Sequence, residues 1–149
     1  MLLAVPPHVV ITAEERPVLM TEEDRRRLLQ LLQREYRERP ECRAALSGLL
    51  KEVHRADVMS PAELPADVVT LGAVVELTEV GRGHAQTVAV VLPEQEDLSR
   101  NRLSVLRPLA TAILGHRVGD EVAVGGADRA GGLQFKIENL LYQPEQASW

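Results

Sequence analysis

The chain has 149 residues, of which 45% are hydrophobic and 3% are aromatic, so one ordinary domain with an aliphatic core is expected. It carries 22 acidic and 17 basic residues, a formal net charge of −5, which argues against binding along nucleic acid by neutralising phosphates. Cys42 is the only cysteine, which excludes an intrachain disulfide and a zinc site built on thiolates. No apolar run approaches the roughly 20 residues that cross a bilayer. We therefore expect a cytoplasmic protein without membrane contact.

Residues 1–17 precede the first helix signal. Their apolar start lacks a basic leading region and is interrupted by two prolines, so it does not resemble a signal peptide. Val9–Ile11 and Val18–Met20 could each form a short strand. We expect residues 1–17 to be a flexible N-terminal extension.

A first helix is predicted to begin after Thr21, a good N-cap that is followed by three acidic residues. Apolar side chains then recur on one face at helical spacing: Leu28, Leu29, Leu32 and Tyr36. Arg39-Pro40 should end this helix, because proline disfavours helical geometry in the residue before it.

A second helix is predicted from Glu41, with an apolar stripe formed by Cys42, Ala45, Leu46, Leu49, Leu50, Val53 and Ala56. Two such helices with a short connector predict an antiparallel hairpin, a short coiled coil, over residues 18–58. Arms of this length reach roughly 25 Å at 1.5 Å per residue. A monomer is favoured, although the stripe could instead pair with a second copy of the chain.

Glu38, Arg39 and Glu41 are predicted to occupy the tip of this hairpin. Two exposed carboxylates could hold a Mg²⁺ ion, but this spacing is common on solvated helices and neighbouring arginines would compete with a metal. No metal site is therefore expected, and Mg²⁺ at Glu38 and Glu41 remains the alternative. The four histidines are scattered, and the glycine-rich residues 125–132 lack a phosphate-loop ending, so no cofactor and no enzymatic activity are expected.

The hydrophobic period changes after Met59, where Ser60, Pro61 and Glu63 form a second helix-start signal. Strands are predicted from Val68 to Leu77, at Thr87–Leu92, at Ser104–Leu106, at Glu121–Val124 and at Leu133–Leu141, with a short helix at Leu109–Leu114. The fold class is therefore α+β, with a helical hairpin followed by a small antiparallel sheet that carries one short helix. We assign residues 59–145 to this globular domain and residues 146–149 to a tail.

Three segments carry a family resemblance. Ser60–Leu71 resembles the start of the globular domain in the Rnk-like branch of the GreA/GreB family, the regulators of nucleoside diphosphate kinase. Leu103–Pro108 together with Ala112–Asp120 resembles the family's strand, proline and helix-turn signature. Leu141–Glu145 is similar to the C-terminal ending of that branch.

This resemblance implies an FKBP-like globular domain and an N-terminal coiled coil. It also implies docking on the rim of the secondary channel of RNA polymerase, without sequence-specific nucleic-acid binding. The docking segment then comprises Ser104, Val105, Leu106, Arg107 and Pro108. The cleavage factors of the family have an acidic residue two places before the proline, where this chain has the apolar Leu106.

The cleavage factors also have helical arms about twice as long and an acidic pair at the tip that ligates Mg²⁺. The shorter arms here imply a transcription regulator that occupies the channel without stimulating transcript cleavage. Two alternatives remain: a cleavage or elongation factor that uses Glu38 and Glu41, and a helical-hairpin interaction module with another protein partner.

Overall fold

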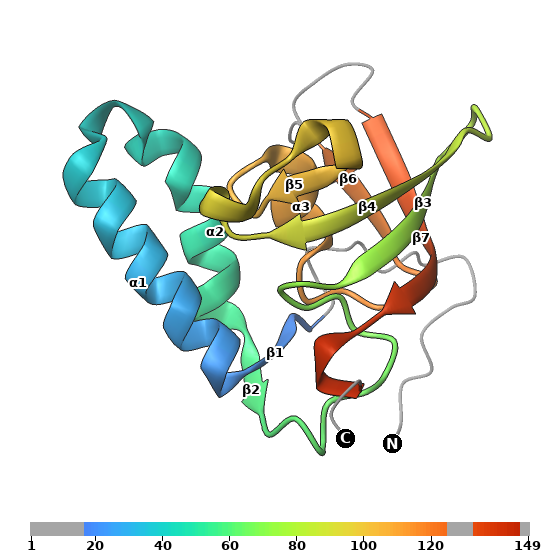
Figure 1. The fold of residues 1–149 in the computed structure, drawn as a ribbon, viewed down its shortest axis with the longest axis horizontal. Helices are drawn as coiled ribbons and strands as arrows, with labels where there is room; N and C mark the ends of the chain where they lie inside the picture. The colour runs from blue at the N-terminus through green and yellow to red at the C-terminus, as the bar shows by residue number, and fades with distance from the viewer. Residues whose placement is uncertain (1–16, 125–132, 147–149) are drawn as a thin grey trace, which may run out of the picture.

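The computed structural model of this chain describes residues 17–124 and 133–146. It has a pair of helices beside a curled five-stranded sheet, which confirms the predicted α+β class (Figure 1). The predicted extension before Pro17, the glycine-rich loop and the last three residues of the predicted tail lie outside the described residues.

The first helix begins and ends where the sequence predicts. Helix α1 (Glu22–Glu38) is capped by Thr21, whose hydroxyl oxygen accepts a hydrogen bond from the Asp24 amide at 3.2 Å. The Arg39 amide still donates to the Glu35 carbonyl oxygen at 2.8 Å, but Pro40 follows and has no amide hydrogen to continue the helix. The chain then turns through η2 (Pro40–Cys42).

The second helix, α2 (Arg43–Arg55), begins two residues after the predicted Glu41, because Pro40–Cys42 forms a tighter helical turn. Figure 1 shows α1 and α2 lying side by side, joined by η2 at the end away from the sheet. We call α1, η2 and α2 together the helical arm. At 17 residues, α1 is about 25 Å long.

A small parallel sheet that the sequence did not predict joins the two strands at the base of the arm. Strand β1 (Leu19–Thr21) pairs with β2 (Asp57–Met59), with Leu19 opposite Asp57 and Thr21 opposite Met59. Because β1 leads into α1 and β2 follows α2, this pairing holds the entry and the exit of the arm together.

The main sheet has the strand order β5-β4-β3-β7-β6. Its strands are β3 (Val74–Glu79), β4 (Ala85–Val91), β5 (Arg102–Ser104), β6 (Glu121–Val124) and β7 (Leu133–Tyr142). Three of the pairings are antiparallel, but β5 runs parallel to β4, so the predicted purely antiparallel sheet is wrong at this edge. The parallel pairing is possible because η3 (Pro93–Gln95) and η4 (Leu98–Arg100) carry the chain back along the sheet.

The start signal at Ser60 leads into hydrogen-bonded turns, with the amides of Glu63 and Leu64 donating to the Ser60 carbonyl oxygen. One other local prediction is wrong. Val68 and Val69 are buried but precede the strand, because the chain turns at residues 71–72 before β3 begins at Val74.

One hydrophobic core connects the arm with the sheet. Helix α3 (Pro108–Ile113) covers part of the sheet and buries Ile113 completely. The core combines arm residues with residues of α3 and the main strands, including Leu28, Leu49, Val53, Val75, Leu77, Ile113 and Ile137. Burial of each such side chain contributes about 1.5–3 kcal/mol, so the arm is held to the sheet mainly by hydrophobic packing.

Gly115 lies at the closest approach between the arm's base and the turn after α3. It has a positive φ of 80°, and a Cβ atom there would lie 2.3 Å from Cγ1 of the fully buried Val18. Its carbonyl oxygen accepts a hydrogen bond from the Leu19 amide at 3.0 Å, and its own amide donates to Val69 at 2.8 Å. A side chain at this position would push β1 away from the turn.

We predict that Gly115→Ala lowers the free energy of unfolding by about 2 to 4 kcal/mol, from left-handed backbone strain and overpacking against Val18. Urea unfolding followed by circular dichroism measures this change. The matched control is Gly48→Ala on the exposed face of α2, where an added Cβ meets nothing within 4 Å. That variant should be neutral or more stable by about 0.5–1 kcal/mol. Equal effects of the two substitutions would contradict the close approach.

Candidate functional site

The predicted docking segment lies at an edge of the main sheet, where the chain passes from β5 into α3. The bend is a tight turn in which the Arg107 amide donates to the Ser104 carbonyl oxygen at 2.9 Å. The Ser104 hydroxyl oxygen accepts a second bond from the Leu106 amide at 3.1 Å. These local bonds end the strand at Ser104, although Ser104–Leu106 was predicted to be extended.

The five predicted docking residues divide into a buried pair and a surface group. Ser104 and Val105 are buried, and the Val105 amide donates to the Val91 carbonyl oxygen at 2.7 Å. Leu106 is half-buried, whereas Arg107 and Pro108 are exposed. We call Leu106, Arg107 and Pro108 the edge corner, since only these three present substantial surface to a partner.

Glu96 holds the edge corner in place. Its Oε1 atom accepts hydrogen bonds from the Ser104 amide at 3.1 Å and from Nε of Arg107, and its Oε2 atom lies 3.3 Å from Nη2 of Arg107. The bond from Arg107 lowers the pKa of Glu96, so this carboxylate stays ionised at neutral pH. Glu96 was not predicted from the sequence, although its position in the polar loop just before the strand was a signal for it.

The start of α3 fixes the other side of the edge corner. Pro108 occupies the first helical position, where a missing amide hydrogen costs nothing, and the Thr111 hydroxyl donates to the Val105 carbonyl oxygen at 2.7 Å. The backbone on both sides of Leu106 is therefore held by hydrogen bonds. The conformation of the edge corner is therefore fixed by bonds within the fold.

The predicted tip residues lie at the free end of the helical arm. Glu38, Arg39 and Glu41 are all exposed, and Nε of Arg39 lies 3.4 Å from Oε2 of the buried Glu35. Within residues 17–124 and 133–146, no group of three or more His, Cys, Asp or Glu side chains could hold a metal ion. The tip carboxylates thus offer at most two protein ligands.

The loop beside the edge corner also contacts the arm. Nη2 of Arg34 on α1 lies 3.8 Å from Oε2 of Glu94 in η3, two residues before Glu96. Both side chains are exposed, so this ion pair contributes at most about 1 kcal/mol. It places the arm next to the loop that holds the edge corner.

A buried carboxyl group lies where the base of the arm meets the sheet. Asp24 in the first turn of α1 is only 4% exposed, and its Oδ2 atom accepts a hydrogen bond from the Leu71 amide at 3.2 Å. The adjacent Thr70 hydroxyl donates to Oε1 of Glu145 in η5 (Pro144–Gln146) at 2.7 Å. Burial, and secondly the negative charge of Glu145, raise the pKa of Asp24 to about 6.

The architecture is thus a pair of helices packed on a curled mixed sheet with an exposed corner before α3. Residues 64–141 match the family described as "Transcription elongation factor, GreA/GreB, C-term". The chain belongs to this family.

Within the family, the chain is similar to the "Regulator of nucleoside diphosphate kinase" of Escherichia coli (strain K12). The two are 36% identical over 102 residues, which cover 67% of this chain and 73% of that relative. The chain is also 31% identical over 102 residues to the transcription elongation factor GreA of Syntrophotalea carbinolica, covering 65% of this chain and 63% of that protein. The predicted resemblance to the GreA/GreB family and its Rnk-like branch is confirmed.

A solved structure described as "Prokaryotic transcription elongation factor GreA/GreB from Nitrosomonas europaea" has a similar fold. It superimposes with a TM-score of 0.69 at 26% identity, covering 84% of this chain and 99% of that one. Separately, none of the helices among the described residues is both long and apolar enough to span a membrane.

The raised pKa of Asp24 predicts a pH-dependent stability. A carboxyl whose pKa is higher in the folded than in the unfolded protein stabilises the fold below its unfolded pKa of 3.8 and loses this contribution as the pH rises through about 6. Relative to Asp24→Asn, the wild type should therefore lose about 2 to 3 kcal/mol of unfolding free energy between about pH 4 and about pH 7.5. Urea unfolding of both proteins at each pH measures the difference.

The control for this prediction is Glu22→Gln, which removes an exposed carboxylate from the same first turn of α1. The difference in unfolding free energy between wild type and Glu22→Gln should change by less than about 0.5 kcal/mol over the same pH range. A difference between wild type and Asp24→Asn that is the same at both pH values would contradict the burial of this charge.

Proposed function

We propose that this protein is a non-enzymatic transcription regulator that binds RNA polymerase at the rim of the secondary channel. The globular region, residues 59–145, docks through the edge corner, with Ser104 and Val105 as its buried support. The helical arm then points into the channel. Family membership supports transcription as the process, and the relatives named above are themselves an elongation factor and a regulator.

The observation that carries the docking proposal is the edge corner itself. It combines a half-buried leucine, an exposed arginine and an exposed proline on a backbone held by hydrogen bonds from both sides. Such a surface loses little conformational freedom on binding. It therefore binds a partner more tightly than a flexible loop of the same composition would. Its apolar centre at Leu106 suits an apolar contact on the polymerase.

The length of the arm supports occupation of the channel without cleavage. At about 25 Å, α1 is much shorter than the arms that the family resemblance implies for cleavage factors. An arm docked at the rim would then stop short of the polymerase active site. Glu38 and Glu41 would remain far from the metal ion that the cleavage reaction uses.

A second candidate function rests on the exposure of those two carboxylates. Glu38 and Glu41 lie at the free end of the arm with both side chains exposed, as an acidic pair that completes a Mg²⁺ site would require. Against this function, Glu38 ends α1 whereas Glu41 lies within η2, and Arg39 stands between them in the sequence. The cleavage experiment below decides between the two candidates.

We predict that core RNA polymerase immobilised on a surface captures the protein and that Leu106→Gln weakens this binding about tenfold, because the substitution removes the apolar centre of the contact. The control is Leu141→Gln on β7, at an exposed leucine distant along the chain from the corner. Equal thermal stability of the two variants would show that both are folded. No capture of the wild type at micromolar concentration would contradict polymerase binding and favour a different protein partner.

We further predict that the wild-type protein leaves the rate of transcript cleavage in a stalled elongation complex unchanged, because the arm is too short to deliver its carboxylates. It should, however, slow the cleavage that a long-armed factor stimulates, by competing for the same rim. Gel analysis of labelled transcripts measures both rates. Faster cleavage with the wild type but not with Glu38→Ala/Glu41→Ala would establish the second candidate instead.

A further inference from the structure

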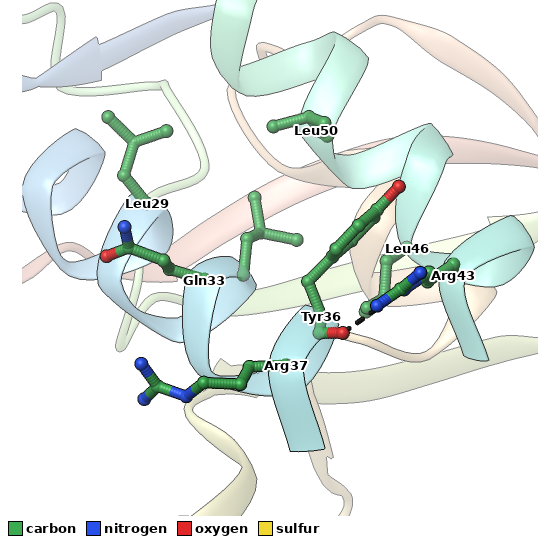
Figure 2. A pocket seen from close by; sticks show the side chains of 8 residues that line it. Leu29, Gln33, Tyr36, Arg37, Arg43, Leu46 and Leu50 are labelled. Carbon is green, nitrogen blue, oxygen red and sulfur yellow. Dashed lines mark hydrogen bonds between the residues drawn. The ribbon is translucent and has the colours of Figure 1, made fainter. Parts of the chain in front are cut away.

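The helical arm has a groove on the face between α1 and α2 that no residue of the described segments covers. The groove has a volume of about 580 Å³ and a floor formed by leucines of both helices, Leu29, Leu32, Leu46 and Leu50. Tyr36 forms part of its wall and is 45% exposed, although it lies on the apolar stripe of α1. Figure 2 shows Leu29 and Tyr36 projecting from α1 and Leu46 and Leu50 from α2.

This groove is distinct from the face that joins the arm to the sheet. The buried members of the arm that pack into the common core are Leu28, Leu31, Leu32, Leu46, Leu49 and Val53. Two of them, Leu32 and Leu46, also line the groove, whereas Leu29 and Leu50 are only partly buried. The exposed apolar surface of the groove therefore comes mainly from Leu29, Leu50 and Tyr36.

The rim of the groove is cationic. Its lining includes Arg37 and Arg43 and, among the described residues, no carboxylate. Arg43 stacks over the Tyr36 ring at 4.5 Å, and its Nε atom donates to the Tyr36 carbonyl oxygen at 3.2 Å (Figure 2). Arg37 forms no ion pair with any residue of the described segments, so its charge is available to a ligand.

The charge of the arm differs from that of the rest of the chain. Residues 22–55 carry nine Lys or Arg against seven Asp or Glu, whereas the remaining residues carry eight against fifteen. The arm therefore has a net positive charge, although the net charge of the whole protein is negative. A ligand of the groove should have an apolar side that packs on the apolar floor. It should also have anionic groups at its edges that pair with the cationic rim.

We propose that this groove binds an amphipathic helix of a partner protein whose apolar stripe is flanked by carboxylates. Leucine and methionine side chains of such a helix would pack on the four floor leucines, as in other helix-in-groove complexes. Its flanking carboxylates would pair with Arg37 and Arg43, and arginine favours this geometry because its planar guanidinium can bind a carboxylate through two hydrogen bonds. This surface is separate from the edge corner and does not depend on polymerase binding.

Two other occupants fit the groove less well. A second copy of the arm would bring the same cationic rim against the first, because a twofold interface uses one surface patch on both subunits. Single-stranded RNA matches the charge, but it binds best to rows of aromatic side chains, and this groove offers only Tyr36 together with the aliphatic floor. An acidic amphipathic helix satisfies both the floor and the rim.

The test measures binding of a synthetic helical peptide to the full-length protein by fluorescence anisotropy. The probe is a fluorescein-labelled helix of about four turns, with leucine along one stripe and glutamate at the flanking positions. The matched peptide has the same leucines with lysine at the flanks. We expect the glutamate peptide to bind at least about tenfold more tightly than the lysine peptide, with the difference shrinking at high salt.

The variant Arg37→Glu/Arg43→Glu should reverse this preference between the two peptides, which a loss of folding would not do. The control variant is Lys51→Glu, an exposed residue of α2 that does not line the groove, and it should keep the wild-type preference. Leu106→Gln should also leave peptide binding unchanged, so a failure of polymerase docking is distinguishable from a failure of this proposal.

Three results would overturn the proposal. One is equal binding of the two peptides to the wild type, which would show apolar association without the cationic rim. Another is a dimer in sedimentation equilibrium that dissociates in Arg37→Glu/Arg43→Glu, which would assign the groove to a second copy. The last is displacement of the glutamate peptide by a short single-stranded RNA at lower concentration than by unlabelled peptide.

Discussion

The contact between Gly115 and the strand that enters the helical arm is the constraint on which the arrangement of this protein depends. The Val18 side chain leaves no room for a Cβ atom at Gly115, and the Leu19 amide donates to the Gly115 carbonyl oxygen. Because β1 leads directly into α1, this contact places the start of the arm against the sheet. The parallel pairing with β2 then fixes where the arm ends.

The two candidate surfaces follow from this placement. With its base held, the arm buries Asp24 beside Leu71 and packs its buried leucines into the common core, while Leu29 and Leu50 stay partly exposed in the groove. The edge corner lies separately, at the end of β5, and depends on Glu96 for its shape. The arm and the corner are thus two rigid surfaces on one core, so a docked corner would set the direction of the arm.

The local elements could largely be predicted from the sequence. Thr21 and Pro40 mark both ends of α1, and the boundaries of β6 agree with its short apolar run, because these signals act within a few residues. The wrong predictions concern contacts between segments that are far apart in the sequence. The parallel β5 and the β1–β2 pair join segments distant in the sequence, and Val68 and Val69 are apolar because the core covers them, although they lie outside the strand.

By itself, the sequence determined the helices, most strands, the apolar faces of the arm and its short length. These are properties of periodicity and capping, which neighbouring residues decide. Only the tertiary structure decided that Ser104 and Val105 are buried beneath the edge corner, that Glu96 binds Arg107, and that Asp24 is buried with a raised pKa. Each of these depends on contacts between elements, since burial and charge pairing arise only when distant segments pack together.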